Sequence, residues 1–332
     1  MAGVKIAAGK ELASLEFFAG IPAGDLAVLA AKLQPLHAVP GEVLMRQGQQ
    51  AVSFAIIASG RVEIEHVGWD GQVLVAELPA GLIVGEIGLL RHRLRTATVT
   101  AKDDVRGYLG YHDAFECMLA MPILAERMVR TARQRLAALI TPIPVTAKDG
   151  TELLLRPVLP GDAERFVEGS AAFSRETLYR RFLSGGGPTK AQLAYLFEVD
   201  YVDHFVWVMT AGVDRPIVGD ARFVRDTDNP ASAEIALTVA DAYQGRGVGT
   251  LLLGALAVAA CVDDIKQFHA VLLADNGAAR ALGDKFNARW EPEEPAVVTT
   301  TMAIPDLEDS PIELQAYRQI NHVARQLIHA FD

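Results

Sequence analysis

This chain of 332 residues has only two cysteines, no excess of basic charge and no long apolar run. The two cysteines, Cys117 and Cys261, are far apart and lie in apolar helical patterns, so we expect buried free thiols rather than a disulfide or a metal site. The apolar run at 251–260 is much shorter than the roughly 20 residues that span a bilayer, which excludes a membrane helix there. No basic and apolar leader opens the chain, which favours a cytoplasmic protein with no membrane partner.

Net positive charge is absent as well, because 31 Lys and Arg stand against 41 Asp and Glu, a net charge of −10. Residues 1–140 are neutral with 14 of each sign, whereas residues 141–332 carry 17 basic and 27 acidic residues. Binding to nucleic acid needs basic surface that displaces counterions, so this class of partner is excluded. An acidic half suits a basic, lysine-bearing protein partner, or it is simply a well-solvated surface.

The pattern of apolar residues divides the chain into two kinds of structure. Short apolar runs broken by glycines extend from 36 to 100 and predict an antiparallel barrel or sandwich. An arginine-rich helical pattern covers 113–140, and beyond residue 151 strands and helices alternate, as in an α/β unit with a mixed sheet. The predicted fold class is therefore α+β with two domains, a jelly-roll-like β-barrel with flanking helices followed by an α/β domain.

The prolines and the Asp149-Gly150 pair of TPIPVTAKDG mark the boundary between these domains. In the tail, apolar residues recur at helical spacing from Ile312 to Phe331 and predict an amphipathic helix. The predicted segments are a first domain at 1–140, a linker at 141–150, a second domain at 151–303 and the tail at 304–332.

The stretch GLIVGEIGLLRHRLRTATVTA, at 81–101, contains a candidate phosphate site. Glu86 opens a short helical turn directly after a glycine, and Arg95 lies nine residues further on. Unpaired amides at the start of such a turn bind anions, and Arg95 adds a charge-assisted bond to a phosphate oxygen. Because Glu86 repels phosphate, it fits a ligand that also offers a hydroxyl, such as a ribose. The stretch thus indicates a nucleotide, and the alternative is a barrel turn with a surface Glu–Arg pair.

Together with the glycine spacing upstream of RVEI, this stretch resembles the phosphate-binding cassette of cyclic-nucleotide-binding domains, over about residues 12–140. The resemblance implies cAMP as the ligand and an arginine-rich last helix that covers its base. Leu94 and Gly88 depart from the proline and alanine common in this family, and Thr96 is a residue type linked there to tolerance of cGMP. The implied nucleotide contacts are Gly85, Glu86, Ile87, Gly88, Arg95 and Thr96, with Arg133, Gln134 or Arg135 reaching the base.

A second candidate phosphate site is the loop QGRGVGT at 244–250, which follows an apolar strand and precedes a long apolar helix. Consecutive amides in such a loop wrap a pyrophosphate, and the positive end of the helix points at it. The loop is not a Walker loop, which needs Gly-Lys-Ser/Thr. It is not a dinucleotide fingerprint either, because that has a longer glycine spacing.

Gln244, Gly247 and Gly249 match motif A of the GNAT family of N-acetyltransferases, Gln/Arg-x-x-Gly-x-Gly/Ala, and the resemblance covers about residues 151–303. It implies that acetyl-CoA binds with its pantetheine arm along the preceding strand, its pyrophosphate in the loop, and further contacts from the helix that begins at ADNGAAR. The implied cofactor contacts are Leu237, Thr238, Val239, Gln244, Gly245, Arg246, Gly247, Val248, Gly249, Thr250, Asn276 and Arg280.

Acetyl transfer to an amine needs a base, because a lysine with a pKa of about 10.4 is almost fully protonated at pH 7. Glu234 is the single carboxylate in the strand SAEIALTVA, and the resemblance places a catalytic glutamate on this strand. The alternative is an edge-strand or ion-paired glutamate. Many members of the family carry a tyrosine that acts as acid toward the thiolate, and Gly283 stands at that position here, so no general acid is assigned. No metal is expected.

The two motifs on one chain closely resemble the cAMP-regulated protein lysine acetyltransferases of mycobacteria, with DYVDHFVWV, VADAYQGRGVG and RTARQRLA all fitting that family. The resemblance implies autoinhibition relieved by cAMP, and protein lysine substrates such as those of acyl-CoA synthetases and universal stress proteins. A small-molecule amine acetyltransferase with the same cofactor is the alternative. A transcription regulator is disfavoured, because the acidic C-terminal half has no helix-turn-helix pattern.

Two further segments receive structural interpretations. The pair Arg180–Arg181 is predicted to lie on a solvated helix face. The tail helix is either a lid that covers the active site when nucleotide is absent or a helix that simply packs on the second domain.

Overall fold

The computed structural model describes residues 9–68, 71–168, 173–182, 189–197, 199–213, 215–294, 296–305 and 312–332. The chain forms two compact units, one ending at Arg135 and including Phe331 and Asp332, the other spanning Leu136–Ala330. No helix in the described ranges is long and apolar enough to cross a membrane.

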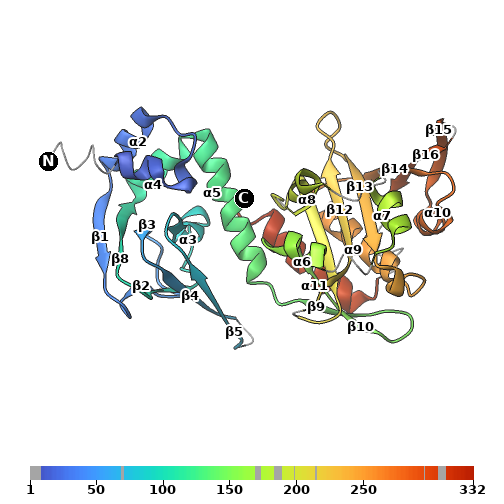
Figure 1. Cartoon of the computed structure of the whole chain (residues 1–332), viewed down its shortest axis with the longest axis horizontal. Helices are drawn as coiled ribbons and strands as arrows, with labels where there is room; N and C mark the ends of the chain where they lie inside the picture. The colour runs from blue at the N-terminus through green and yellow to red at the C-terminus, as the bar shows by residue number, and fades with distance from the viewer. Residues whose placement is uncertain are drawn as a thin grey trace. The chain divides into compact units, whose positions relative to one another are not determined.

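The N-terminal unit is built from two four-stranded antiparallel sheets, with strand orders β1-β8-β3-β6 and β2-β7-β4-β5 (Figure 1). This arrangement agrees with the predicted jelly-roll-like barrel. The strands are β1 (Gln34–Ala38), β2 (Val43–Met45), β3 (Ser53–Ser59), β4 (Val62–Val67), β5 (Val73–Leu78), β6 (Ile83–Val84), β7 (Thr98–Ala101) and β8 (Val105–Tyr111). The helices are η1 (Glu16–Phe18), α2 (Ala23–Ala30), α3 (Glu86–Leu90), α4 (His112–Leu119) and α5 (Pro122–Ala138).

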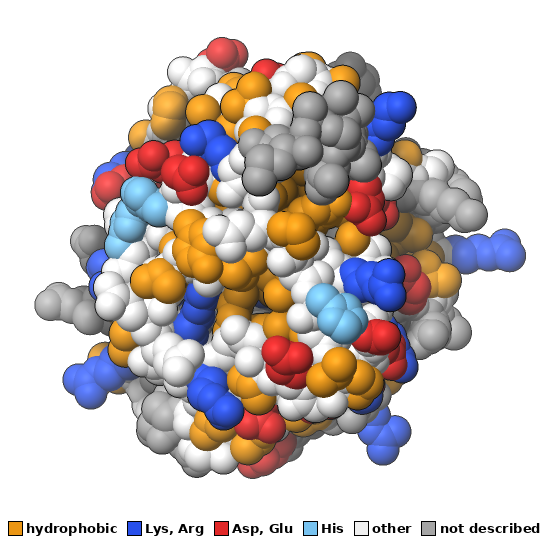
Figure 2. Space-filling view, turned by 90° about the vertical axis from the view of Figure 1, so that its left-hand side faces the viewer, with side chains coloured by type: hydrophobic (Ala, Val, Ile, Leu, Met, Phe, Trp, Pro, Cys, Tyr) orange, Lys and Arg blue, Asp and Glu red, His pale blue; other side chains and the backbone are white. Residues whose placement is uncertain are grey.

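The core of this unit lies on both sides of β3, whose run Phe54–Ile57 is completely buried. Phe54 and Ile56 pack with the flanking helices, whereas Ala55 and Ile57 face the second sheet, because successive side chains of a strand point to opposite faces. Figure 2 shows the side of the unit that lies to the left in Figure 1, where hydrophobic side chains gather near the centre and charged ones stand around them.

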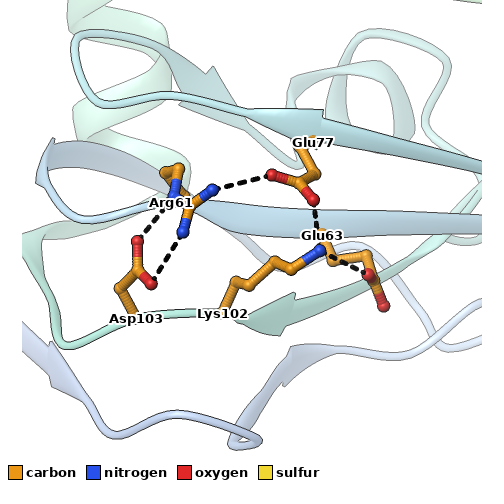
Figure 3. A network of polar contacts seen from close by, with 5 residues as sticks. All are labelled: Arg61, Glu63, Glu77, Lys102 and Asp103. Carbon is orange, nitrogen blue, oxygen red and sulfur yellow. Dashed lines mark hydrogen bonds and ion pairs between the residues drawn. The ribbon is translucent and has the colours of Figure 1, made fainter.

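Five charged residues form a network at the start of β4 (Figure 3). The guanidinium of Arg61 donates two bonds to Asp103, at 2.7 and 3.1 Å, and one to Glu77 at 3.1 Å. Lys102 pairs with Glu77 and, at 3.4 Å, with Glu63. These partners hold the pKa of Glu77 and of Asp103 below their usual values and raise that of Lys102. All five side chains are substantially exposed, so the network joins the β4–β5 hairpin to the β7–β8 turn without burying charge.

The predicted helix at 113–140 is wrong in one respect, because the structure divides it into α4 and α5. The chain leaves the helix at Ala120 and re-enters it at Pro122. Proline has no amide hydrogen and disfavours helical geometry in the residue before it, whereas it is well tolerated in the first turn of a new helix. The break therefore has a local cause that was visible in the sequence.

The C-terminal unit is a mixed eight-stranded sheet of order β15-β16-β14-β13-β12-β11-β10-β9, as the predicted α/β domain requires. The strands are β9 (Ile143–Thr146), β10 (Glu152–Pro157), β11 (His204–Thr210), β12 (Ile217–Arg225), β13 (Ser232–Val239), β14 (Gln267–Leu273), β15 (Arg289–Glu294) and β16 (Val297–Ala303). The helices are α6 (Asp162–Glu168), α7 (Arg175–Phe182), α8 (Lys190–Phe197), η3 (Asp241–Tyr243), α9 (Val248–Val262), α10 (Gly277–Asp284) and α11 (Leu314–Ile328). Strand β9 lies inside the predicted linker.

Helix α9 is the central helix of this unit. It is apolar on nearly all sides, as a helix buried between other elements must be, and 11 of its 15 residues are buried. One side packs on the sheet, where the indole of Trp207 donates to the carbonyl of Ala255 at 3.1 Å. The other side contacts α11 through the apolar face predicted for the tail. The prediction that both cysteines are buried is wrong, because Cys117 is half-buried and Cys261 is exposed near the end of α9.

Strands β13 and β14 are the parallel pair of this sheet, and they separate after a short paired segment. Ser232–Glu234 pairs with Gln267–His269, and no pairing is recorded between the described residues that follow. The second half of β13 therefore has one edge available to a ligand, next to the N-terminus of α9.

Candidate functional site

The first candidate site surrounds α3 in the N-terminal unit. Gly85 is the N-cap of this helix and has φ 87°, a left-handed conformation that favours glycine. A Cβ at this position would also lie 2.7 Å from the guanidinium of Arg95 and from the sulfur of Met45. The glycine thus lets the backbone turn sharply against Arg95, as the sequence predicted for a phosphate-binding turn.

Arg95 is almost fully buried, and backbone carbonyls fix its guanidinium. Its two terminal nitrogens donate to the carbonyl of Gly85 at 2.8 Å, and to the carbonyl and hydroxyl of Ser53 at 2.6 and 3.1 Å. Burial lowers the pKa of Arg95, and the charge of Glu86 opposes this shift. A buried guanidinium whose recorded hydrogen-bond partners are neutral groups is well suited to an anionic ligand.

Glu86 is 1% exposed, and its carboxylate accepts a bond of 2.6 Å from Arg135 on α5. Arg135 also donates to the carbonyl of Ile83 at 2.7 Å. Of the three candidates for contact with the base, Arg135 thus reaches the cassette in this structure. Arg133 and Gln134 are half-buried on α5, and the guanidinium of Arg133 lies over the ring of Phe331 at 5.6 Å. The role of Ser53 and the Arg135–Glu86 pair were not foreseen, because both join segments that are far apart in sequence.

The other predicted cassette residues lie nearby. Ile87 and Gly88 complete the first turn of α3, and both are buried. A Cβ on Gly88 would lie 2.7 Å from the Cβ of Ala51, so the departure from alanine at this position matches a close approach of the preceding loop. The carbonyl of Thr96 bonds to the ring of His66 on β4 at 2.6 Å.

The second candidate site is a pocket of about 460 Å³ where β13 and β14 separate. The glycine loop lies at its edge, with Gly247 as the N-cap of α9 at φ 86°. Nine of the twelve predicted cofactor contacts line this pocket: Leu237, Thr238, Val239, Gln244, Gly245, Gly247, Gly249, Thr250 and Asn276. The strand, the loop and the start of α10 are thus brought around one cavity.

The remaining three predicted contacts have other neighbours. Arg246 pairs with Asp149 at 3.0 Å and lies over the ring of Tyr243. Val248 is buried in the core, and the guanidinium of Arg280 stacks on Trp290, a pocket-lining residue, at 5.3 Å. The side chain of Asn276 also caps α10, because its Oδ1 accepts a hydrogen bond from the amide of Ala279 at 3.1 Å.

Glu234, the predicted base, lies at the last position where β13 pairs with β14, opposite Val224 on β12 and His269 on β14. It is exposed, and the pocket lining begins at the following residue, Ile235. Because side chains alternate along a strand, Glu234 shares a face with Ala236 and Thr238, which both line the pocket. The side chain of Glu234 therefore lies next to the pocket, on the same face of β13.

The prediction of a solvated Arg180–Arg181 pair is wrong at Arg181. This side chain is 7% exposed and lies 3.8 Å from the carboxylate of Asp220, and its Nε donates to the hydroxyl of Thr238 at 2.8 Å. The hydrogen bond from Arg181 thus links α7 to β13 on the face of the sheet that carries Glu234. Thr177, Arg180, Arg181 and Lys148 all line the pocket, and sequence motifs had given no signal for any of them.

Burial also perturbs two groups on this face of the sheet. The pKa of His204 falls to about 4, through burial first and the nearby charge of Arg222 second, so the ring is neutral at pH 7. Burial and the charge of Arg181 lower the pKa of Arg222 to about 10, whereas Asp220 and Glu234 oppose this shift. Nε2 of His204 and one terminal nitrogen of Arg222 are buried without a hydrogen-bond partner among the described residues.

Comparisons with known proteins identify the kind of domain that holds each site. A family model for the cyclic nucleotide-binding domain matches residues 35–120, and one for the acetyltransferase (GNAT) domain matches residues 152–289. The acetyltransferase Pat of Mycolicibacterium smegmatis is 50% identical over 320 residues, which cover 96% of each chain. This chain belongs to the Pat acetyltransferase family. A solved structure titled as a cAMP-binding acyltransferase from Mycobacterium smegmatis is 46% identical over the whole of both chains, with a TM-score of 0.54.

A more distant relative matches the Pat-family chain only in part. The acetyltransferase PA5475 of Pseudomonas aeruginosa is 29% identical over 163 residues, which is 47% of this chain and 86% of that protein. Together the comparisons confirm the predicted family, fold class and acetyltransferase activity. They also confirm the two kinds of ligand, a cyclic nucleotide as effector and acetyl-CoA as cosubstrate.

Proposed function

We propose that this Pat-family protein transfers the acetyl group of acetyl-CoA to the ε-amine of lysine residues in other proteins, and that cAMP bound to the N-terminal domain regulates the transfer. The observation that carries the proposal is the pocket at the splayed strands, with the glycine loop at one edge and Glu234 beside the other. We place the reaction in the cytoplasm, a reducing compartment in which cysteines outside any disulfide are ordinary.

Glu234 acts as the base in this proposal, directly or through one water molecule. Its carboxylate takes the proton that the lysine ammonium must lose, and the neutral amine then attacks the thioester carbon. As the C–N bond forms, the C–S bond breaks and CoA leaves as a thiolate, which then takes up a proton. The amides of β13 next to the pocket orient the thioester, so the protein supplies mainly position and a proton acceptor.

Protein lysines, rather than small amines, fit the charge of the catalytic half. Residues 141–332 carry 27 acidic and 17 basic residues, a surface that attracts lysine-rich partners. We propose acyl-CoA synthetases and universal stress proteins as the type of substrate. Incubation with labelled acetyl-CoA, a cell lysate and a panel of amines, with and without cAMP, tests this. Label on proteins that increases with cAMP supports the proposal, and label on free amines alone would establish a small-molecule acetyltransferase instead.

Replacing Arg95 with Lys is expected to weaken cAMP binding about tenfold or more. The guanidinium is held by three bonds to Gly85 and Ser53, and a lysine ammonium cannot reproduce this forked geometry. Calorimetric titration with cAMP measures the effect, and titration with acetyl-CoA, whose site lies in the other unit, is the control. Unchanged cAMP affinity would remove Arg95 from the nucleotide site.

The C-terminal lid is a second regulatory proposal, and the packing of α11 sets its test. Ile320, Val323, Ala324, Leu327 and Ile328 are buried, and α11 contacts α9 and β9. A lid movement would have to expose this apolar face. If α11 is a lid, adding cAMP should change hydrogen exchange of its amides at least several-fold. Unchanged exchange, despite saturation with cAMP, would favour a plain packing helix.

A further inference from the structure

We infer that Lys148, which belongs to no recognised motif, binds the phosphate groups of coenzyme A from the side of the glycine loop that faces β9. The inference rests on the proposed binding of acetyl-CoA in this pocket, and it deepens that proposal by naming a charged contact outside motif A. Three observations carry it: the position of Lys148 against the loop, its place in the pocket lining, and the absence of a charge partner.

The backbone holds Lys148 directly against the loop. Its amide donates to the carbonyl of Arg246 at 2.8 Å. Its side chain crosses Gly247, because a Cβ built on that glycine would lie 2.8, 3.2 and 3.3 Å from Cγ, Cδ and Cε of Lys148. Gly247 is the N-cap of α9, and Lys148 lines the pocket. The lysine stem thus runs over the turn whose amides are expected to hold a pyrophosphate.

The charges around the pocket single out this lysine. Four basic side chains line the pocket: Lys148, Arg180, Arg181 and Lys285. Arg180 pairs with Glu176 at 2.7 Å, and Arg181 lies 3.8 Å from Asp220. Lys285 follows the last turn of α10, where the negative end of the helix dipole favours a cation.

The positive charge of Lys148 is not balanced by a nearby negative charge in this way. No ion pair of its ammonium is recorded with any described residue, and the neighbouring carboxylate of Asp149 is paired with Arg246 at 3.0 Å. It also lies at the N-terminus of α9, where the helix dipole is positive and disfavours a cation. A cation kept at a positive helix end makes physical sense when a ligand brings the anion, and the phosphates of CoA are the anionic part of the cosubstrate.

The test compares Lys148→Met, which keeps the apolar stem over Gly247, with Lys148→Arg, which keeps the charge. Calorimetric titration with acetyl-CoA should show about tenfold weaker binding for the Met variant and near wild-type binding for the Arg variant. Lys266→Met is the matched control, an exposed lysine of the same unit that does not line the pocket, and it should change the affinity less than threefold.

Two truncated cosubstrates locate the contact. With S-acetyl-pantetheine, which has no nucleotide phosphates, kcat/KM should be equal for wild type and Lys148→Met. With 3′-dephospho-acetyl-CoA, a persistent tenfold defect assigns the contact to the pyrophosphate, and loss of the defect assigns it to the 3′-phosphate. Either result supports the inference.

Other outcomes overturn it. Equal affinity of wild type and Lys148→Met for acetyl-CoA would refute the contact. A loss of kcat/KM in Lys148→Met that is as large with S-acetyl-pantetheine as with acetyl-CoA would also refute it, because the damage would then be structural. A wild-type protein that binds no acetyl-CoA at all would refute the proposed function, and this inference with it.

Discussion

Replacing Glu234 with Gln is expected to lower kcat for acetyl transfer by about 100-fold or more while leaving the affinity for acetyl-CoA unchanged. The substitution preserves the shape of the side chain but removes the proton acceptor. Because Glu234 lies outside the pocket lining, which begins at Ile235, the cosubstrate should lose no contact. The deficit should shrink as the pH rises toward 10, since an acceptor lysine with a pKa of about 10.4 then becomes neutral without help.

Single-turnover kinetics with a lysine-bearing protein substrate measure the loss, and calorimetry with acetyl-CoA measures binding. Glu152→Gln is the matched control, because Glu152 is an exposed glutamate on β10 of the same sheet and does not line the pocket. Turnover of the Glu234 variant within a few-fold of wild type would exclude this residue as the base. Glu234 would then be an exposed glutamate without a part in the reaction; the edge-strand alternative considered from the sequence is wrong, because Glu234 pairs with β12 on one side and β14 on the other.

Replacing Asp162 with Ala is expected to lower the free energy of unfolding of the C-terminal unit by about 3–5 kcal/mol. Asp162 is 1% exposed, and both its oxygens accept from the buried guanidinium of Arg156, at 2.7 and 2.8 Å. It also accepts from the amide of Leu159 at 2.7 Å, which fixes the turn into α6. Removal of the carboxylate leaves a buried guanidinium with the carbonyl of Pro157 as its remaining recorded partner.

Native-state hydrogen exchange of the slowest amides in β10 and β11 measures this loss within the unit, without assuming that the whole chain unfolds together. Glu176→Ala is the control, because it removes the exposed pair with Arg180 and should cost about 0.5 kcal/mol or less. A change below about 1 kcal/mol in the Asp162 variant would show that the unit relaxes enough to hydrate Arg156.

The elements that could be predicted are those whose cause is local. The turn at Gly85-Glu86 and the loop from Gln244 to Thr250 are contiguous, and their glycines, helix starts and charges act on neighbouring residues. The apolar run after the loop likewise indicated a helix there, and the spacing in the tail indicated one apolar face. The break before Pro122 belongs to the same class, although the arginine-rich pattern concealed it.

The contacts that could not be predicted join residues far apart in the chain. Arg135 reaches Glu86, Arg181 reaches Asp220 and Thr238, and Lys148 lies over Gly247. Nothing in the local sequence of Arg181 distinguishes a solvated arginine from a buried one, because burial depends on what the sheet places opposite α7. The exposure of Cys261 was missed for the same reason, since exposure depends on which elements pack around α9.

The sequence by itself therefore determined the two domains, both glycine turns, the family and the kind of ligand each domain binds, because these follow from short-range backbone conformation and contiguous motifs. Only the tertiary structure decided which charges accompany those turns, through strand pairing and helix packing. Strand pairing places Glu234 at the end of the β13–β14 ladder. Packing places Arg135 on Glu86 and Lys148 at the N-terminus of α9. Electrostatic partners depend on distance in space, and distance in space is set by packing rather than by position along the chain.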